Sequence, residues 1–210
     1  MSTRSLFPSR IESERLRFKP LYESLDTLDL YEYHRSGDID TVMQYLSQER
    51  HATPKESTNT LETAEERWKD CTRAEYAIYP KPGEGRAGEF AGVASLMLEW
   101  EKQLCYFGLW LRKPFWGRGY SGERAGAMLY VAFELLDLEL MGVSYTPGNE
   151  RSKRAIEKYV ETYGGQYSGP LRNWIPDDEE PQDIETYVVL REQWRDAVTR
   201  EKLATLSVER

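Results

Sequence analysis

Three glycines stand close together just before a segment with the pattern of a helix. Gly117, Gly119 and Gly122 are followed by apolar residues that recur at helical spacing over residues 125–136. Glycine lets the backbone approach an anion closely, and the first N–H groups of a helix point toward such a guest. The combination therefore predicts a site for a phosphate or pyrophosphate. The other interpretation is a glycine-rich turn that only starts the helix.

Three phosphate-binding patterns compete for these glycines. A P-loop requires Lys and then Ser or Thr after its last glycine, but a Glu-Arg pair follows here. The series Gly117-x-Gly119-x-x-Gly122 matches the dinucleotide fingerprint literally. That fingerprint directly follows a strand, however, and Lys113-Pro114 intervenes in this sequence. A nicotinamide-binding domain is therefore disfavoured, and an acyl-coenzyme A (acyl-CoA) is the third candidate.

The segments around the glycines resemble the acyl-CoA motif of the GNAT superfamily of N-acetyltransferases, in the branch that includes the ribosomal-protein-alanine N-acetyltransferases. The resemblance is carried in order by residues 108–111, by residues 115–122, and by Asn149-x-x-Ser152 with Glu157-Lys158. Residues 11–16 resemble the first strand of that branch more faintly. The resemblance implies an α/β (α+β) fold, a single GNAT-like domain. Its sheet would be mixed and mostly antiparallel, with a parallel splayed pair at the centre and helices on both faces.

The resemblance also implies where acetyl-CoA, the co-substrate, would bind. Backbone amides of residues 117–122 would hold its pyrophosphate, residues 109–111 would pair with its pantetheine arm, and Asn149 would bond that arm. Trp116 and Tyr120 flank the glycines and could cover the co-substrate. The full set of expected co-substrate residues is Leu109, Trp110, Leu111, Trp116, Gly117, Arg118, Gly119, Tyr120, Ser121, Gly122, Asn149 and Ser152.

The catalytic residues are less directly implied. Ser152 matches a serine that can sit near the CoA sulfur and return a proton to the leaving thiolate. The tyrosine that protonates this thiolate in many superfamily members aligns with Ile156, and Tyr106 stands where the branch often has Glu. Glu99 and Glu101 are nearby substitutes for a general base, or else exposed charges at a strand end. Water can also take the proton of the amine, because positioning the reactants (roughly 7–11 kcal/mol) outweighs acid–base help.

Two functions follow from the resemblance. The first is an acetyl-CoA-dependent N-acetyltransferase that acts on a primary amine, a protein N-terminus or a small molecule, by direct attack on the thioester. The second is a non-catalytic acyl-CoA-binding or protein-interaction module with the same fold. The replaced tyrosine and glutamate favour the module, whereas the intact glycine series and Ser152 favour the enzyme.

The elements that must position these residues can be predicted from periodicity and turn residues. We expect strands over residues 15–20, 75–79, 90–100, 103–111, 140–145, 166–174 and 185–190. We expect helices over two parts of 25–46, over 60–72 with Thr60 as its cap, over 125–136 and 152–160, and in a charged tail at 192–206. Strands 103–111 and 140–145 should pair in parallel, because a helix connects them.

Composition limits the number of domains and the kinds of partner that the chain can have. The chain has 210 residues, with 28 Lys and Arg against 36 Asp and Glu, a net charge of −8. This fits one domain over residues 1–210 and argues against a nucleic-acid partner. No apolar run reaches the roughly 18 residues of a membrane span and no signal sequence is evident, so we expect no membrane partner and a cytoplasmic protein. Cys71, Cys105 and the two histidines lack metal-ligand spacing, so we expect no metal. A homodimer is plausible.

Charge is predicted to be uneven along the chain. We expect the four basic residues Arg112, Lys113, Arg118 and Arg124 to make the surroundings of the glycines positive. The acidic loop 176–183 could border an acceptor site and attract an amine, although a solvated loop is the simpler interpretation.

Overall fold

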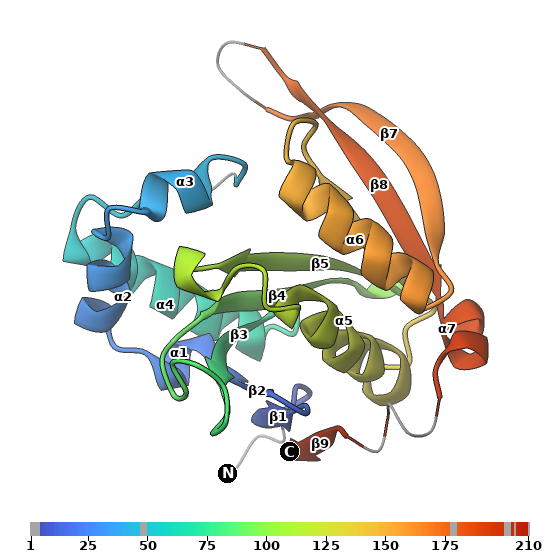
Figure 1. Ribbon diagram of the computed structural model, residues 1–210, viewed down its shortest axis with the longest axis horizontal. Helices are drawn as coiled ribbons and strands as arrows, with labels where there is room; N and C mark the ends of the chain where they lie inside the picture. The colour runs from blue at the N-terminus through green and yellow to red at the C-terminus, as the bar shows by residue number, and fades with distance from the viewer. Residues whose placement is uncertain (1–4, 47–49, 177–179, 200–202, 204, 210) are drawn as a thin grey trace.

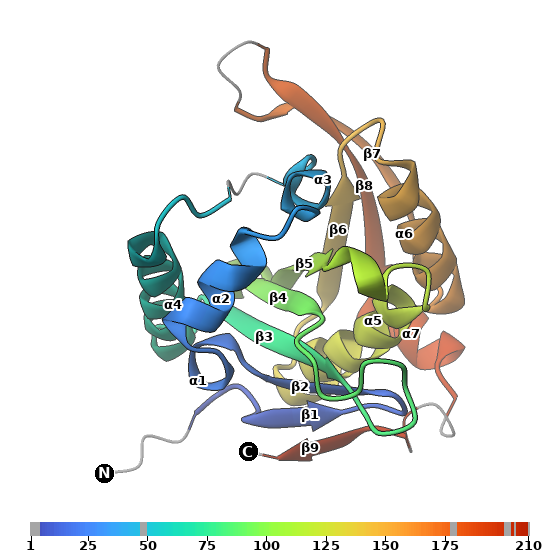
Figure 2. The same ribbon diagram turned by 60° about the vertical axis from the view of Figure 1, so that its left-hand side comes forward.

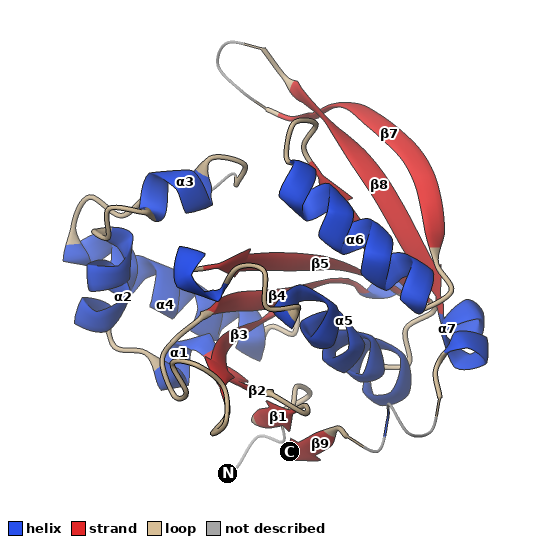
Figure 3. Ribbon diagram, viewed as in Figure 1, coloured by secondary structure: helices blue, strands red, loops and turns tan. Residues whose placement is uncertain are grey.

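A single nine-stranded sheet runs through the protein (Figures 1 and 3). The computed structural model describes residues 5–46, 50–176, 180–199, 203 and 205–209. The strand order is β7-β8-β6-β5-β4-β3-β2-β1-β9, with β5 and β6 parallel and the other neighbours antiparallel. The strands are β1 (Arg10–Glu12), β2 (Leu16–Pro20), β3 (Arg73–Pro80), β4 (Gly92–Glu99), β5 (Leu104–Leu111), β6 (Leu140–Tyr145), β7 (Gln166–Ile175), β8 (Gln182–Leu190) and β9 (Ser207–Glu209).

Helices cover both faces of this sheet (Figure 2). They are α1 (Leu21–Ser24), α2 (Thr27–His34), α3 (Ile39–Met43), α4 (Pro54–Lys69), α5 (Tyr120–Tyr130), α6 (Glu150–Thr162) and α7 (Arg191–Ala197). Side chains alternate along β5, so that Phe107 joins the apolar cluster of α5 and α6 while Trp110 packs against the cluster of α2 and α4. The mixed sheet and its two helical layers confirm the fold class predicted from the sequence.

The parallel pair β5 and β6 separates part-way along its length. Their register covers Leu104 with Leu140, Cys105 with Met141, and Tyr106 with Gly142. A side chain at Gly142 would place its Cβ 2.8 Å from the Tyr106 ring, so glycine allows the strands to meet here. Beyond this point β5 pairs with β4 and β6 pairs with β8. We call the space between residues 107–111 and residues 143–145 the fork. The two strands that border it are the splayed pair that the family resemblance implied.

Several helix bounds differ from the prediction. Helix α4 begins at Pro54, with Thr53 as its N-cap, because proline suits the first turn of a helix. Thr60 therefore lies inside the helix rather than at its start. In the C-terminal tail, α7 ends at Ala197 and the chain returns as β9, where Val208 lies opposite Ile11 of β1.

The predicted acidic loop 176–183 is only partly described. Residues 177–179 lie outside the described residues, and β8 already begins at Gln182. Over the part of the chain that the structure describes, no helix combines the length and the apolar character that a membrane crossing requires.

Candidate active site

The glycines form a turn that leads from β5 into helix α5. After β5, a short 3-10 turn (Lys113–Phe115) reaches Gly117 and Gly119, whose φ values of +75° and +78° favour glycine. Gly119 is the N-cap of α5, and no side chain caps the helix there. The first N–H groups of a helix have no partner within it, and its dipole makes this end positive. The turn therefore presents backbone donors that an anion can accept.

Partly buried polar contacts hold this turn in place. The Glu123 carboxylate of α5 accepts from Ser13 Oγ at 2.7 Å and from Arg15 Nε at 2.8 Å. Arg15 Nη1 in turn donates to the carbonyl oxygen of Arg118 at 2.9 Å. Tyr120 is buried and donates to a Glu84 oxygen at 2.7 Å, and its burial raises the pKa of this hydroxyl. The side chain of Tyr120 thus anchors the turn and is not available to cover a bound molecule. That role is left to neighbouring residues.

Trp116 closes the other side of the turn. Its Nε1 donates to the carbonyl oxygen of Leu111 at 2.7 Å, and the guanidinium carbon of Arg151 lies 3.5 Å from the ring centroid. Arg151 belongs to α6, so this stack connects the glycine turn with the helix that follows β6.

Helix α6 begins at the same end of the sheet. Asn149 is its N-cap, and the side-chain oxygen accepts from the backbone N–H of Ser152 at 3.1 Å. This use leaves the amide NH2 group of Asn149 for another partner, and Ser152 is half-buried in the first turn. The hydroxyl of Tyr45, which follows α3, donates to the carbonyl oxygen of Gly148 at 3.1 Å. The loop before α6 is therefore held from the N-terminal side of the chain as well.

The parallel direction of β5 and β6 brings these parts together. The carboxyl end of β5 leads to the glycine turn before α5, and the carboxyl end of β6 leads to the start of α6, where Asn149 and Ser152 lie (Figure 2). Residues 109–111 form the β5 side of the fork between them. The arrangement offers an extended edge for a flexible arm, a helix N-terminus for an anion at one end, and a serine across the fork.

Residues 15–159 match the family model of the acetyltransferase (GNAT) domain. The chain belongs to the GNAT family of acetyltransferases. This confirms the family predicted from the sequence and the class of enzyme, an N-acetyltransferase. No functionally curated protein matches the sequence.

Solved structures of acetyltransferases share the fold. A GCN5-related N-acetyltransferase from Brucella melitensis has a TM-score of 0.74 at 19% identity, over 95% of this chain and 84% of that one. The ribosomal L7/L12 alpha-N-protein acetyltransferase RimL in complex with coenzyme A has a TM-score of 0.71 at 16% identity, over 85% and 95%. The spermidine N-acetyltransferase from Vibrio cholerae in complex with CoA and spermine has a TM-score of 0.66 at 15% identity, over 86% and 98%.

Glu99 and Glu101 lie at the other end of β5 in this acetyltransferase. Glu99 pairs with Leu104, the first residue of β5, and its exposed carboxylate lies 3.5 Å from Lys102 Nζ. Leu111 lies seven residue steps along the strand from Leu104, a distance of about 23 Å. The structure does not bring either glutamate to the fork, and their positions fit exposed charges at a strand end.

The four basic residues predicted around the turn do not form one exposed patch. The first three bind other parts of the chain: Arg112 Nη1 donates to Phe90 O at 2.6 Å, Lys113 Nζ to Asp38 Oδ1 at 2.8 Å, and Arg118 Nη1 to Gly85 O at 2.6 Å. Arg124 points inward and is 2% exposed. Contrary to the expectation from the sequence, the helix N-terminus is therefore the principal positive feature of the turn.

Sequence reasoning missed one buried carboxylate. It belongs to Glu75, on the face of the sheet opposite α5 and α6. Glu75 of β3 pairs with Ser95 of β4, which pairs with Gly108 of β5 inside the fork region. Glu75 is buried, and its carboxylate lies 3.0 Å from Arg73 Nη2. Two strand spacings place Glu75 about 10 Å from the β5 backbone. The signal was a glutamate in a strand that is otherwise mostly apolar, since an acidic residue is seldom buried without a partner.

The same face carries both histidines of the acetyltransferase. The rings of His34 and His51 stack with centroids 3.6 Å apart, and the centroid of Trp110 lies 6.3 Å from that of His34. Hydroxyls of Ser57 and Thr60 contact the two ring nitrogens of His51. This is a hydrogen-bonded core pair, and no cluster of three potential metal ligands occurs within the described ranges.

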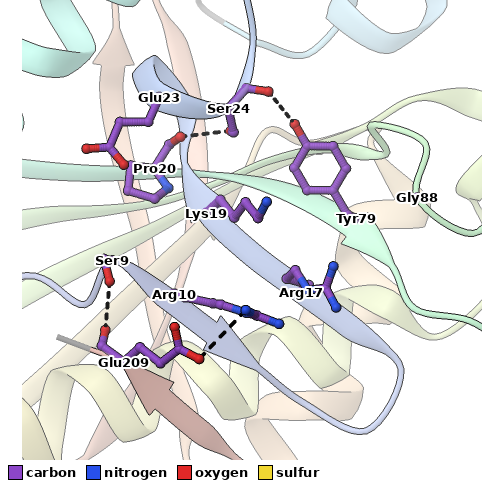
Figure 4. A pocket seen from close by; sticks show the side chains of 10 residues that line it. All are labelled: Ser9, Arg10, Arg17, Lys19, Pro20, Glu23, Ser24, Tyr79, Gly88 and Glu209. Carbon is purple, nitrogen blue, oxygen red and sulfur yellow. Dashed lines mark hydrogen bonds and ion pairs between the residues drawn. The ribbon is translucent and has the colours of Figure 1, made fainter.

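Two cavities lie away from the glycine turn. One of about 560 Å³ lies over β1 and β2, near the β9 edge of the sheet, where Arg10, Arg17 and Lys19 line it (Figure 4). Another of about 420 Å³ lies where β6 ends, between Thr146 and the β7–β8 hairpin, and includes Glu180 and Asp183. The second cavity adjoins the loop that leads into α6, so it borders the candidate site on an acidic side.

Proposed function

We propose that this acetyltransferase binds acetyl-CoA in the fork and transfers the acetyl group to a primary amine by direct attack on the thioester. The observation that carries the proposal is the separation of β5 from β6 after Tyr106 and Gly142, with a glycine-capped helix and Ser152 at the open end. An extended pantetheine arm can use the edge of β5 that β6 leaves, while the pyrophosphate accepts from the N–H groups of α5.

The co-substrate contacts are assigned as the sequence predicted. The arm pairs with Leu109, Trp110 and Leu111, and the amide of Asn149 donates to one of its carbonyl oxygens. The diphosphate lies against residues 117–122, and Trp116 flanks it. These roles use groups that are backbone donors or half-buried side chains, which fits a negatively charged, partly extended molecule.

During the transfer, one proton must reach the CoA sulfur and another must leave the amine. The amine nitrogen forms a bond to the acetyl carbon, the carbon–sulfur bond breaks, and the CoA sulfur takes a proton from Ser152. The proton of the amine leaves through water. Glu75, a buried carboxylate about 10 Å from the β5 backbone, is proposed to receive it through that water. Ser152 regains its proton from solvent. Positioning of the two reactants remains the larger contribution.

The acceptor is proposed to bind as a cation and to lose one proton to water before the neutral amine attacks. Glu180 borders the loop before α6, next to Asp183, which is paired with Arg172. The acidic net charge of −8 also favours the approach of an ammonium group. Protein N-termini and polyamines both carry such a group. The alternative function, a non-catalytic acyl-CoA-binding module, is favoured by Ile156 and Tyr106 at the positions of the family's tyrosine and glutamate.

Two experiments test the proposal. Isothermal titration should detect acetyl-CoA binding, and no heat at millimolar ligand would refute a co-substrate site. A screen of amines and peptide N-termini with acetyl-CoA, read by release of free thiol, should find an acceptor. Tight binding of acetyl-CoA without release for any amine class would instead support the non-catalytic module.

A further inference from the structure

Arg124 is a buried cation without a partner of opposite charge. Its side chain leaves the first half of α5, and 2% of the residue is exposed. Its Nε and Nη1 atoms are buried and make no hydrogen bond within the described part of the chain, where no carboxylate pairs with it either. Arginine is almost never fully buried unless it is paired. We therefore expect a bound molecule to supply the missing partner of this side chain.

The guanidinium group lies at the closed end of the fork. Its Cζ is 5.2 Å from the ring centroid of Phe107 and 5.6 Å from that of Tyr159 on α6. Phe107 directly follows Tyr106, the last β5 residue that pairs with β6. The buried hydroxyl of Tyr159 lies beside this guanidinium and interacts with it electrostatically, but it does not reach hydrogen-bond geometry with the buried Nε and Nη1 atoms. Two helices thus direct unsatisfied polar atoms to the place where the strands part.

The chemistry of this place favours an anion. Two aromatic rings attract a cation, yet burial still lowers the pKa of Arg124, because its charge is removed from water. A neutral carbonyl would satisfy the N–H groups but leave that charge unpaired. A carboxylate does both, since it accepts two hydrogen bonds from a guanidinium and neutralises it.

The direction of the co-substrate decides which of its groups arrives there. If the diphosphate lies at the N-terminus of α5, the arm runs back along β5, past Leu111 and then Leu109. The acyl end then comes next, beside Phe107 and Arg124. We propose that Arg124 binds the free carboxylate of a dicarboxylic acyl group, with the Tyr159 hydroxyl as a second donor. The acetyltransferase would then prefer an acyl-CoA such as succinyl-CoA over a neutral one of equal length. This inference rests on the proposed co-substrate site in the fork.

The same bonds form and break for a dicarboxylic acyl group as for an acetyl group. The amine nitrogen bonds to the thioester carbon, the carbon–sulfur bond breaks, and the amine loses one proton while the CoA sulfur gains one. The distal carboxylate stays ionised on the product amide and takes no part in the reaction. Arg124 is thus a specificity-determining residue that touches the acyl group.

The test compares three thioesters by isothermal titration without acceptor: acetyl-CoA, butyryl-CoA and succinyl-CoA, the last two with four-carbon acyl groups. The whole chain should bind succinyl-CoA about tenfold or more tightly than butyryl-CoA. Arg124→Met keeps much of the side-chain volume and should remove this preference while leaving butyryl-CoA within about threefold. Arg154→Met, an exposed arginine of α6, makes the same charge change and should keep the preference.

Several results would overturn the inference. One is butyryl-CoA binding as tightly as succinyl-CoA in the unmodified chain. Another is an equal loss for both thioesters in Arg124→Met, which indicates a packing role. A third is slower acetyl transfer in that variant with unchanged affinities, which assigns Arg124 to the leaving sulfur. Should Arg124→Met fail to fold, Tyr159→Phe must weaken succinyl-CoA more than butyryl-CoA. Binding of no thioester overturns the proposed function as well, whereas acetyl-CoA binding without a succinyl preference overturns this inference alone.

Discussion

Acidification should destabilise the fold through the stacked histidines. His34 is 4% exposed, its ring lies parallel to that of His51, and its Nδ1 accepts a hydrogen bond from the backbone N–H of His51 at 3.1 Å. A protonated ring would lose this acceptor and bring a charge into the core. Burial first, and then the neighbouring His51, lowers the pKa of His34 to about 4, from its usual 6.5.

The sign and size of the effect follow from this shift. The unfolded chain binds a proton at His34 below about pH 6.5, but the folded chain does so only near pH 4, so the free energy of unfolding falls as the pH drops between these values. At 1.36 kcal/mol for each pKa unit, the loss between about pH 7.5 and pH 5 is about 2 kcal/mol. The pKa of His51 is also lowered by burial, so its contribution has the same sign. Glu12, whose pKa is about 2 because Arg17 and Arg10 bind it, loses its contribution only below the usual 4.5.

Urea denaturation at a series of pH values measures this loss. His34→Asn is the matched variant, because an amide oxygen can replace Nδ1 as the acceptor while the side chain does not titrate. The variant should be less stable at neutral pH, since it loses the stacked ring, and its pH dependence should be smaller by about 2 kcal/mol over the same interval. An identical pH dependence in both proteins would refute the reasoning.

Three further predictions concern the fork. Gly117→Ala should weaken acetyl-CoA about tenfold or more. Gly88→Ala should leave the affinity unchanged, because Gly88 has nearly the same φ, +77° against +75°, and equally open surroundings. Ser152→Ala should lower kcat about tenfold or more with the acetyl-CoA affinity within about threefold, and equal losses in both would contradict an acid role. Asn149→Asp should keep the melting temperature, because the N-cap acceptor remains, but weaken acetyl-CoA about fivefold or more; unchanged affinity in a titration would argue against an amide bond to the arm.

Local signals in the sequence were sufficient to predict much of the local structure around the candidate site. The parallel pairing of β5 with β6 follows from the helix between them, and the strand 140–145 was placed at its observed bounds because apolar residues end at a Pro-Gly turn. The glycine turn has a left-handed backbone, and the Asn-x-x-Ser series forms a helix N-cap. Both depend on adjacent residues and not on distant parts of the chain.

Features that depend on long-range packing could not be predicted in this way. Strand β9 exists because Val208 reaches Ile11 across nearly the whole chain, which no local pattern encodes. Arg124 was expected at the surface because its charge normally keeps it there, yet the space between α5 and α6 takes it inward. Glu75 was overlooked although its strand was recognised. Only the sheet order shows that Glu75 lies in register with Gly108, two strands away.

The central claim is that the fork holds the acyl-CoA and supports transfer to an amine. Mass spectrometry of the acceptor after incubation with acetyl-CoA and this chain tests it most directly, with Gly117→Ala in parallel. We predict that the acceptor gains one acetyl group in step with free thiol release, and that the variant loses both at a co-substrate concentration that saturates the unmodified chain. Acetylation that continues undiminished in the variant, or saturating acetyl-CoA binding with no acetylated product from any class of amine, would contradict the claim.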